Sequence, residues 1–319
     1  MSARSCEGSC VPASDPVELP AGITVLERGW LSSNNVLFTD ASSTAIVDTG
    51  YTSHSGQTSA LVRRALADRP LDLIVNTHLH SDHCGGNAEL QAVYSRAQTL
   101  IPPGLVQAVR DWNPDALTYE PTGQECPSFR MDGVLMPGTE IRLGGNSWQV
   151  HGAPGHDPHS VILYEPENRI LISADALWES GFGVVFQELE GIEAFDAVAS
   201  TLDLIERLRA RTVIPGHGSA FTAIDEAIHR ARLRLDSFVQ NPERHARHAI
   251  KVLLKFKLLD LQEVSYSAFE AWALEMPYVR QVRQRFFPDA EPAEWLKSLL
   301  CDLERSGAAS LEDARIFNR

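Results

Sequence analysis

The sequence predicts an α/β protein in which two β-sheets lie face to face with helices on their outer sides, followed by a small helical domain. Three observations lead to this prediction. Short strand-like runs fall into two groups, within residues 23–76 and 139–214, and amphipathic helical stretches follow the second group and interrupt the first. Beyond residue 241 the strand-like runs disappear, and apolar residues recur at helical spacing.

The first group consists of apolar and β-branched runs separated by Asn, Ser, Asp and Gly turn residues. The elements expected from it are strands at Ile23–Glu27, Asn35–Thr39 and Thr44–Asp48, a helix at Thr58–Leu66, and a strand at Leu71–Asn76. Weaker patterns then predict a helix or loop at Asn87–Gln91, a strand at Ala92–Ser95 and a short helix at Pro103–Arg110. The next stretch, 111–138, is rich in Pro and Gly. Two interpretations of it stay open, a substrate-binding loop and a surface excursion.

The second group carries hairpin turns such as Gly144-Gly145-Asn146, which separate its strands. The expected strands are Thr139–Leu143, Trp148–His151, Val161–Glu165, Ile170–Ser173 and Thr212–Ile214. Apolar residues three and four apart predict one helix within 195–208 and another within 224–238.

Three domains or segments follow from these patterns. Residues 1–21 read as a poorly ordered leader, 22–240 as the sandwich, and 241–319 as a small domain of three helices. The boundary falls at Asn241-Pro242, where the composition changes. An alternative keeps the last helices as an elaboration of the main core.

The composition is that of a water-soluble protein, with 44% hydrophobic and 22% charged residues among 319. The sequence has neither a membrane-spanning run nor a secretory signal, so we place the protein in the cytoplasm and expect no membrane partner. A formal net charge of −14 disfavours nucleic acid as the partner of the whole surface. The five cysteines are too scattered for a disulfide framework, and Cys6 with Cys10 forms at most half a metal site.

A dense cluster of metal-binding side chains follows the strand Leu71–Asn76. His78, His80, Asp82 and His83 lie within six residues of one another. Imidazole nitrogen and carboxylate oxygen are the ligands that zinc and similar divalent metals prefer. Cys84, inside the motif, is read as a small neighbour rather than a ligand.

Three further strand ends carry candidate ligands: His156 after Trp148–His151, Asp175 after Ile170–Ser173, and His217 after Thr212–Ile214. Each one alone is an ordinary turn or capping residue. Together they repeat one arrangement, in which a potential ligand directly follows a buried strand.

With these motifs in this order, residues 22–240 resemble the metallo-β-lactamase superfamily. The resemblance implies a four-layer αββα sandwich of two mixed β-sheets flanked by helices. The residues that carry it are Asp48, His78, His80, Asp82, His83, His156, Asp175 and His217. Position 157–160 departs from common relatives, because Asp-Pro-His-Ser stands where many members have Thr-Pro-Gly-His or Thr-Pro-Gly-Ser.

The resemblance also implies a site for two divalent metal ions. It assigns His78, His80 and His156 to one ion and Asp82, His83 and His217 to the other, with Asp175 as the bridge. Asp48 is expected to support a ligand instead of binding metal. We expect zinc, while iron and manganese stay open because the ligand set contains no thiolate.

The expected activity is hydrolysis, in which a metal-bound hydroxide attacks the ester-like bond of a small molecule such as a thioester or lactone. Asp82 and His217 are the residues expected to act in catalysis. The main alternative is a ribonuclease or phosphodiesterase of the same fold, favoured by basic residues within 244–257 and 280–285 and by a weak resemblance of the C-terminus to a winged helix. A mononuclear iron oxygenase is a further alternative, and the sequence is compatible with a homo-oligomer.

Several polar residues near the motifs have no assigned role. His54 and Tyr51 are open between lining the pocket and lying at the surface. His159 is open between facing the substrate and being a polar turn residue before the strand at Val161. His151, His245 and His248 lie outside the motifs and are interpreted as structural or surface residues.

Overall fold

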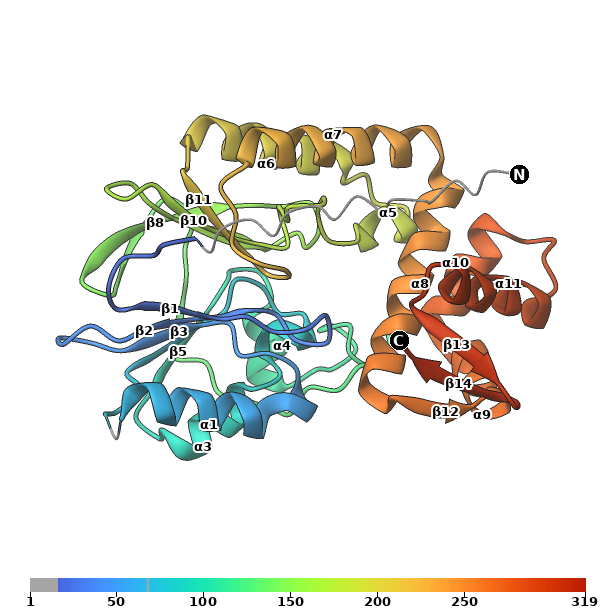
Figure 1. Ribbon diagram of the computed structural model, residues 1–319, viewed down its shortest axis with the longest axis horizontal. Helices are drawn as coiled ribbons and strands as arrows, with labels where there is room; N and C mark the ends of the chain where they lie inside the picture. Colours follow the sequence, from blue (N-terminus) through green and yellow to red (C-terminus); the bar gives the residue numbers. More distant parts are fainter. Residues whose placement is uncertain (1–16, 68) are drawn as a thin grey trace, which may run out of the picture.

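The computed structural model describes residues 17–67 and 69–319. Most of the predicted leader, together with Cys6 and Cys10, therefore lies outside the described residues. None of the helices in the described ranges is long and apolar enough to cross a membrane. From Ile23 onward the chain builds the predicted α/β sandwich, and its four layers can be followed in Figure 1.

The first sheet has six strands in sequence order, β1-β2-β3-β4-β5-β6. β1, β2 and β3 pair antiparallel, whereas β3 to β6 pair parallel, so the sheet is mixed as predicted. The strands are β1 (Ile23–Leu26), β2 (Asn35–Phe38), β3 (Ala45–Val47), β4 (Leu73–Val75), β5 (Gln98–Ile101) and β6 (Gly133–Val134). All residues of β2 and β3 are buried, as expected for strands covered on both faces.

The second sheet has five strands in the order β11-β10-β9-β8-β7. β7 to β10 pair antiparallel and β10 pairs parallel with β11, so this sheet is mixed too. The strands are β7 (Glu140–Leu143), β8 (Asn146–Gly152), β9 (Val161–Glu165), β10 (Ile170–Ala174) and β11 (Thr212–Pro215). Facing side chains of the two sheets, among them Phe38 and Trp148, form the central core.

Helices cover the outer face of each sheet (Figure 1). α1 (Ser55–Leu66) and α3 (Asn87–Val93) pack on the first sheet, where Val62, Leu66 and Leu90 join a core with Ile46 and Ile74. α6 (Phe195–Leu208) and α7 (Ile224–Gln240) cover the second sheet. Shorter helices, η1 (Thr52–His54), α2 (Ser81–Cys84), α4 (Val106–Asp111) and α5 (Phe186–Glu190), lie in the connections.

One predicted strand is wrong. Ala92 and Val93 belong to helix α3, and the strand comes later, as β5. The apolar run Ala92–Tyr94 is too short for its periodicity to separate a helix from a strand. Leu90 is fully buried against the first sheet and fixes the helical turn that contains Ala92 and Val93.

The C-terminal region contains more than the three predicted helices. Its elements are α8 (Pro242–Leu261), β12 (Glu263–Ser265), α9 (Tyr266–Glu275), α10 (Pro277–Phe286), α11 (Pro292–Arg305), β13 (Ala309–Glu312) and β14 (Arg315–Asn318). The prediction that strands disappear here is wrong, because β12, β14 and β13 form a small antiparallel sheet. After α8 the region consists of a strand, three helices and a final hairpin, and the weak resemblance to a winged helix stays a prediction. The boundary at 241 stays a prediction; α7 ends at Gln240 and α8 begins at Pro242.

α8 connects the C-terminal region to the sandwich. It runs across the end of the two sheets in Figure 1, and the ring of its Phe256 lies 5.0 Å from the ring of Tyr51. Tyr278 of α10 donates its hydroxyl to the Phe186 carbonyl of α5 over 3.1 Å. These contacts close the sandwich at the end where the candidate ligands lie.

Candidate metal centre

All seven predicted ligands lie together at one end of the sandwich. They come from the segments that follow β4, β8, β10 and β11. The structure arranges them in two groups, His78 with His80 and His156, and Asp82 with His83, Asp175 and His217. Within each group, one potential ligand atom per residue lies within 4.8 Å of every other. The two groups match the two sets of ligands that the family resemblance implied. Asp175, the expected bridge, lies in the second group.

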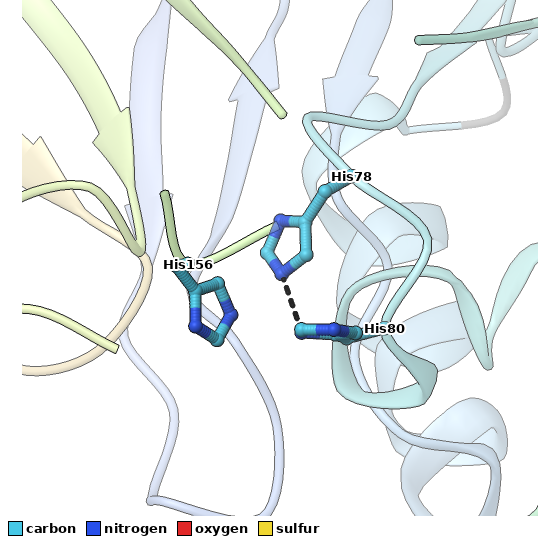
Figure 2. Close-up of side chains that lie close together, drawn as sticks. All are labelled: His78, His80 and His156. Carbon is cyan, nitrogen blue, oxygen red and sulfur yellow. Dashed lines mark hydrogen bonds between the residues drawn. The ribbon is translucent and has the colours of Figure 1, made fainter. Parts of the chain in front are cut away.

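The first group consists of three imidazoles that face one another (Figure 2). His78 Nε2 and His80 Nδ1 are 3.1 Å apart. His156 Nδ1 donates to the carbonyl of Val184 over 2.6 Å, which fixes its proton on Nδ1 and leaves a lone pair on Nε2. That Nε2 atom is buried and has no hydrogen-bond partner.

The second group combines two imidazoles with two carboxylates. Asp82 Oδ2 lies 3.0 Å from His217 Nε2 and 3.7 Å from His83 Nε2. His83 and His217 are buried, whereas Asp82 is partly exposed and lines a cavity. A charged cluster of this kind is costly to bury unless its members are paired or bind a cation.

Asp175 reaches both groups. Its Oδ1 lies 3.4 Å from His83 Nε2, and its Oδ2 lies 3.4 Å from His156 Nε2. The indole Nε1 of Trp178 donates to Oδ1 over 3.1 Å. Ala174, directly before it, adopts a left-handed φ of 47°, and the pairing of β10 with β11 shifts register there. Backbone strain of this type is concentrated at functional sites, and here it turns the carboxylate between the two groups.

Asp48 supports the second group without facing it. Its Oδ2 accepts from His83 Nδ1 over 2.8 Å and from the Thr77 hydroxyl over 2.7 Å, and its Oδ1 accepts from the Thr77 amide over 2.9 Å. Because an ionised carboxylate only accepts, His83 carries its proton on Nδ1. Its Nε2 atom therefore faces Asp82 and Asp175, the position expected for a ligand held by an outer carboxylate.

The two groups differ in their electrostatics. Burial, reinforced by His83 and His80, lowers the pKa of His78 well below its usual range. Burial, reinforced by His156, lowers the pKa of His80 to about 4. Both imidazoles are neutral at pH 7, the form that binds metal. Burial also opposes a charge on His83, but Asp175 and Asp48 outweigh it and raise its pKa well above the usual range, so this second position favours a cation.

The residues fit a pair of divalent metal ions. His83 Nε2 and His156 Nε2 are buried without hydrogen-bond partners, an arrangement that is rare unless such atoms bind something. Five imidazoles and two carboxylates are a nitrogen and oxygen donor set suited to zinc and related borderline metals. Cys84 belongs to neither group, and its Sγ lies near the His80 carbonyl, Tyr119 and Cys126, in agreement with its interpretation as a neighbour.

Gly216 provides a test of this packing. A Cβ at this position would overlap Asp175 Oδ1 and lie 3.0 Å from His83 Cε1. We expect Gly216→Ala to displace the Asp175 carboxylate and to weaken metal binding about tenfold, because supporting contacts orient ligands. Competition with a chromogenic chelator measures the affinity. Gly56→Ala is the control, since nothing lies within 4 Å of its Cβ position; an equal effect of both changes would contradict the prediction.

A cavity of about 660 Å³ opens beside the two groups. His80, Asp82, His156, Asp175 and His217 contribute to its wall. Residues of the 111–138 insert, including Leu117 and Gln124, line it as well, which favours the binding-loop interpretation of that stretch over a surface excursion. Helices α5, α7, α8 and α10 and several connecting segments contribute further wall residues.

The sequence left the roles of three polar residues open, and the structure shows whether each of them lines the cavity. His159 lines the cavity. Tyr51 does not line it, and its hydroxyl accepts from the Glu125 amide over 3.1 Å; only 1% of its surface is exposed, so the surface interpretation is wrong for Tyr51. His54 is partly exposed and its Nδ1 lies 2.9 Å from Ser32 Oγ.

Sequence reasoning missed four cavity residues from distant elements. Trp30 stacks on the His217 ring at 5.3 Å, and Trp178 meets the same ring edge-on. Arg234 of α7 and His248 of α8 also line the cavity, although His248 was interpreted as structural or surface. No local pattern marks these residues, because folding alone brings them to the site.

Comparison with known proteins adds three similar sequences and two similar structures. The acyl-coenzyme A thioesterase MBLAC2 of Gallus gallus is 31% identical over 167 residues, which are 49% of this chain and 59% of that protein. The Bos taurus protein of the same name is 28% identical and aligns with 62% of this chain and 78% of its own. A hydroxyacylglutathione hydrolase of Francisella tularensis subsp. holarctica is 32% identical, over 42% of this chain and 45% of that protein. The chain thus spans less than two thirds of the length of the Gallus gallus protein, and the same is true of the Homo sapiens protein of that name.

Among solved structures, a metallo-beta-lactamase family protein from Thermus thermophilus has a TM-score of 0.56, at 19% identity, over 95% of this chain and 100% of that chain. A beta-lactamase domain protein from Burkholderia ambifaria has a TM-score of 0.57 at 18% identity, and the alignment covers 98% of this chain and 97% of that chain. At such identities the likeness shows the fold alone, and it includes the C-terminal region.

The family model described as metallo-beta-lactamase superfamily matches residues 28–217, more than half of the chain. The match spans Asp48 and all seven predicted ligands, so the resemblance drawn from the motifs is confirmed. The chain belongs to the metallo-beta-lactamase superfamily.

Proposed function

We propose that this chain is a metal-dependent hydrolase of thioesters that uses two divalent cations. His78, His80 and His156 would hold one ion; Asp82, His83 and His217 would hold the other, with Asp175 between them. The observation that carries the proposal is the position of Asp175, whose two carboxylate oxygens each lie 3.4 Å from a histidine of a different group. Zinc is the metal that this donor set favours, while iron and manganese are compatible with it.

When bound, such a pair of ions polarises a carbonyl and lowers the pKa of water toward neutrality. The chain's own residues then position the reactants. Burial opposes ionisation of Asp82, but His83 and His217 outweigh it and lower its pKa, so its carboxylate stays an acceptor. Asp82 Oδ2 also lies 3.0 Å from His217 Nε2, so the two side chains orient each other at the cavity wall. Both are therefore placed to act on the reacting group.

The relatives and the cavity support a thioester as the substrate. Coenzyme A and glutathione, which appear in the names of the similar proteins, are both thiols that carry acyl groups. Apolar side chains from several elements line the cavity, among them Leu117, Val184, Phe186, Leu253 and Phe256. An apolar wall of this kind suits an acyl chain next to the reacting carbonyl.

The alternative that the chain is a nuclease has less support than thioester hydrolysis. It depended on the basic residues within 244–257 and 280–285 and on the weak winged-helix resemblance, but most side chains of the first stretch are engaged inside the C-terminal region. Arg247 and Lys251 lie 2.8 and 3.5 Å from Asp302 Oδ2, and Lys257 lies 3.2 Å from Asp260. Lys255 donates to the carbonyl of Ala308 over 2.6 Å. Arg244 alone of this stretch has no side-chain partner among the described residues. In the second stretch, Arg283 donates to the carbonyl of Ala290 over 2.8 Å.

Metal analysis combined with a substrate panel tests the proposal. We expect close to two zinc equivalents per chain and turnover of acyl thioesters in preference to β-lactam, lactone, phosphodiester and RNA substrates. Removal of metal with a chelator should abolish turnover and lower the unfolding free energy by about 4 kcal/mol for each ion present at a thousand times its Kd. Added zinc should restore both quantities. Fewer than one metal per zinc-replete chain, or cleavage of RNA without cleavage of thioesters, would contradict the proposal.

A further inference from the structure

A second hollow adjoins the cavity where α7 meets α8. It measures about 780 Å³ and shares Arg234 and His248 with the cavity beside the metal centre. Its wall is basic: four permanently cationic side chains face one carboxylate, that of Glu243. We call it the basic pocket, and its cationic residues are Arg234, Arg244, Arg247 and Lys251. It is an unusual feature in a chain with a net charge of −14.

Arg234 stands between the two hollows without a counter-ion. No carboxylate among the described residues pairs with it. Its guanidinium lies over the rings of Phe182 and Phe238, at 5.7 and 5.5 Å from their centroids, and is mostly buried. A guanidinium stays charged in a protein, and burial of a charge without a partner is unfavourable. The position therefore favours an anion supplied from outside the chain.

His248 does not supply that anion. Arg234 Nη2 donates to His248 Nε2 over 2.6 Å, so the imidazole accepts and is neutral. Burial, reinforced by the charge of Arg234, lowers the pKa of His248 to about 3. The hydrogen bond holds the guanidinium in place, and Phe182 and Phe238 fix its plane. The remaining guanidinium N–H groups are left to a ligand.

The other cations of the basic pocket leave a positive excess. Arg247 and Lys251 share the single carboxylate of Asp302. Arg244 is exposed, and its guanidinium has no partner among the residues that the structure describes. Four basic side chains against the two carboxylates of Asp302 and Glu243 leave a net excess of two positive charges, which suits a group with several negative charges better than a single carboxylate.

We propose that the basic pocket binds the phosphate groups of the substrate's thiol carrier, with Arg234 and Arg244 as the recognition residues. The inference rests on the proposed thioester hydrolysis and narrows it to acyl groups on a phosphorylated nucleotide thiol. The acyl end then occupies the apolar cavity beside the metal centre, and the carrier passes Arg234 into the basic pocket. A thiol carrier without phosphates, such as glutathione, leaves the buried cation of Arg234 unpaired and binds less well.

Binding measurements on the full-length protein test the pocket without any need for turnover. Isothermal calorimetry compares coenzyme A with pantetheine, which has the same thiol arm and no phosphates. We expect coenzyme A to bind at least about tenfold more tightly, and Arg234→Gln and Arg244→Gln each to remove about tenfold of its affinity. Pantetheine binding should stay the same in the Arg244→Gln variant, because Arg244 lines only the basic pocket. Arg244 is exposed, so its variant is informative even if Arg234→Gln folds poorly.

The matched control is Arg232→Gln on the same helix. Arg232 pairs with Asp203 and Glu206 and lines neither hollow, so its loss should leave both affinities unchanged. Equal affinities for coenzyme A and pantetheine, or an equal loss in all three variants, would overturn the proposal. So would a single-stranded RNA that binds more tightly than coenzyme A through the same two arginines.

Kinetics then separate this inference from the proposed function. For an acyl-coenzyme A, Arg244→Gln should raise KM about tenfold with kcat unchanged, and both constants for the matching acyl-pantetheine should be unaffected. If no thioester is hydrolysed but the calorimetric pattern holds, the proposed function is wrong and the anion site stands. If both thioesters are hydrolysed equally well by every variant, thioester hydrolysis stands and the phosphate subsite is wrong.

Discussion

Replacing Asp175 with alanine is expected to lower the metal content from the proposed two ions per chain to one or none and to reduce kcat about a thousandfold. The carboxylate lies between the two histidine groups, with Oδ1 toward His83 and Oδ2 toward His156. Alanine at 175 leaves His83 and His156 without this shared partner. The imidazoles that remain could still hold one ion, but the positive charge of the proposed metal pair would no longer be concentrated beside the carbonyl of the proposed thioester. Metal analysis and turnover of one thioester, measured on the same preparation, give both quantities.

A second buried carboxylate provides the control for this variant. Glu165 ends β9 and is fully buried, and its oxygens accept the amides of Glu167 and Asn168 in the following turn. Glu165→Gln therefore removes a buried charge without touching either group of ligands. We expect it to lower the unfolding free energy while the metal content stays at two. Full turnover by the Asp175→Ala protein would refute the bridging role.

The ligand positions could be predicted because each is a local feature of the sequence. Asp175 and His217 directly follow buried strands, and the ends of β10 and β11 are neighbours in one sheet. A His or Asp that follows a recognisable strand can therefore be assigned to the sheet edge from the sequence alone. The two mixed sheets followed from the same strand signals, together with the family resemblance of the motifs.

The walls of the cavity could not be predicted in this way. Trp30, Arg234 and Phe256 lie on separate elements, and no spacing in the sequence relates them to the ligands. Arg234 reads as one more cation on the polar face of α7, next to Arg232. Only the folded structure brings Phe182 and His248 of α8 against its guanidinium. The hairpin of β13 and β14 was missed for a related reason, since each strand is four residues long and stable only against its neighbours.

Asp48→Asn is expected to empty one half of the metal centre selectively. The amide of Thr77 donates to Asp48 Oδ1 over 2.9 Å, so an asparagine must keep its oxygen at that position. Its NH₂ group then faces His83 Nδ1, where the carboxylate Oδ2 now accepts. His83 can accept this hydrogen bond only by moving its proton to Nε2, the atom that faces Asp82 and Asp175. An Nε2 that carries a proton cannot bind a metal ion.

The shift of the His83 proton from Nδ1 to Nε2 predicts the selective loss of one metal site, which a general loss of stability would not produce. Asparagine tolerates the left-handed φ of 58° at position 48 as aspartate does, so the backbone is not strained by the change. We expect the affinity of the group containing Asp82, His83 and His217 to fall about tenfold to a hundredfold. The group of His78, His80 and His156 should keep its ion, so titration with zinc should show one tight and one weak site. Asp132→Asn is the matched control, because Asp132 accepts the Thr99 amide in the same sheet and touches neither group. Two tight sites in the Asp48→Asn protein, or one weak site in both variants, would show that Asp48 does not set the tautomer of His83.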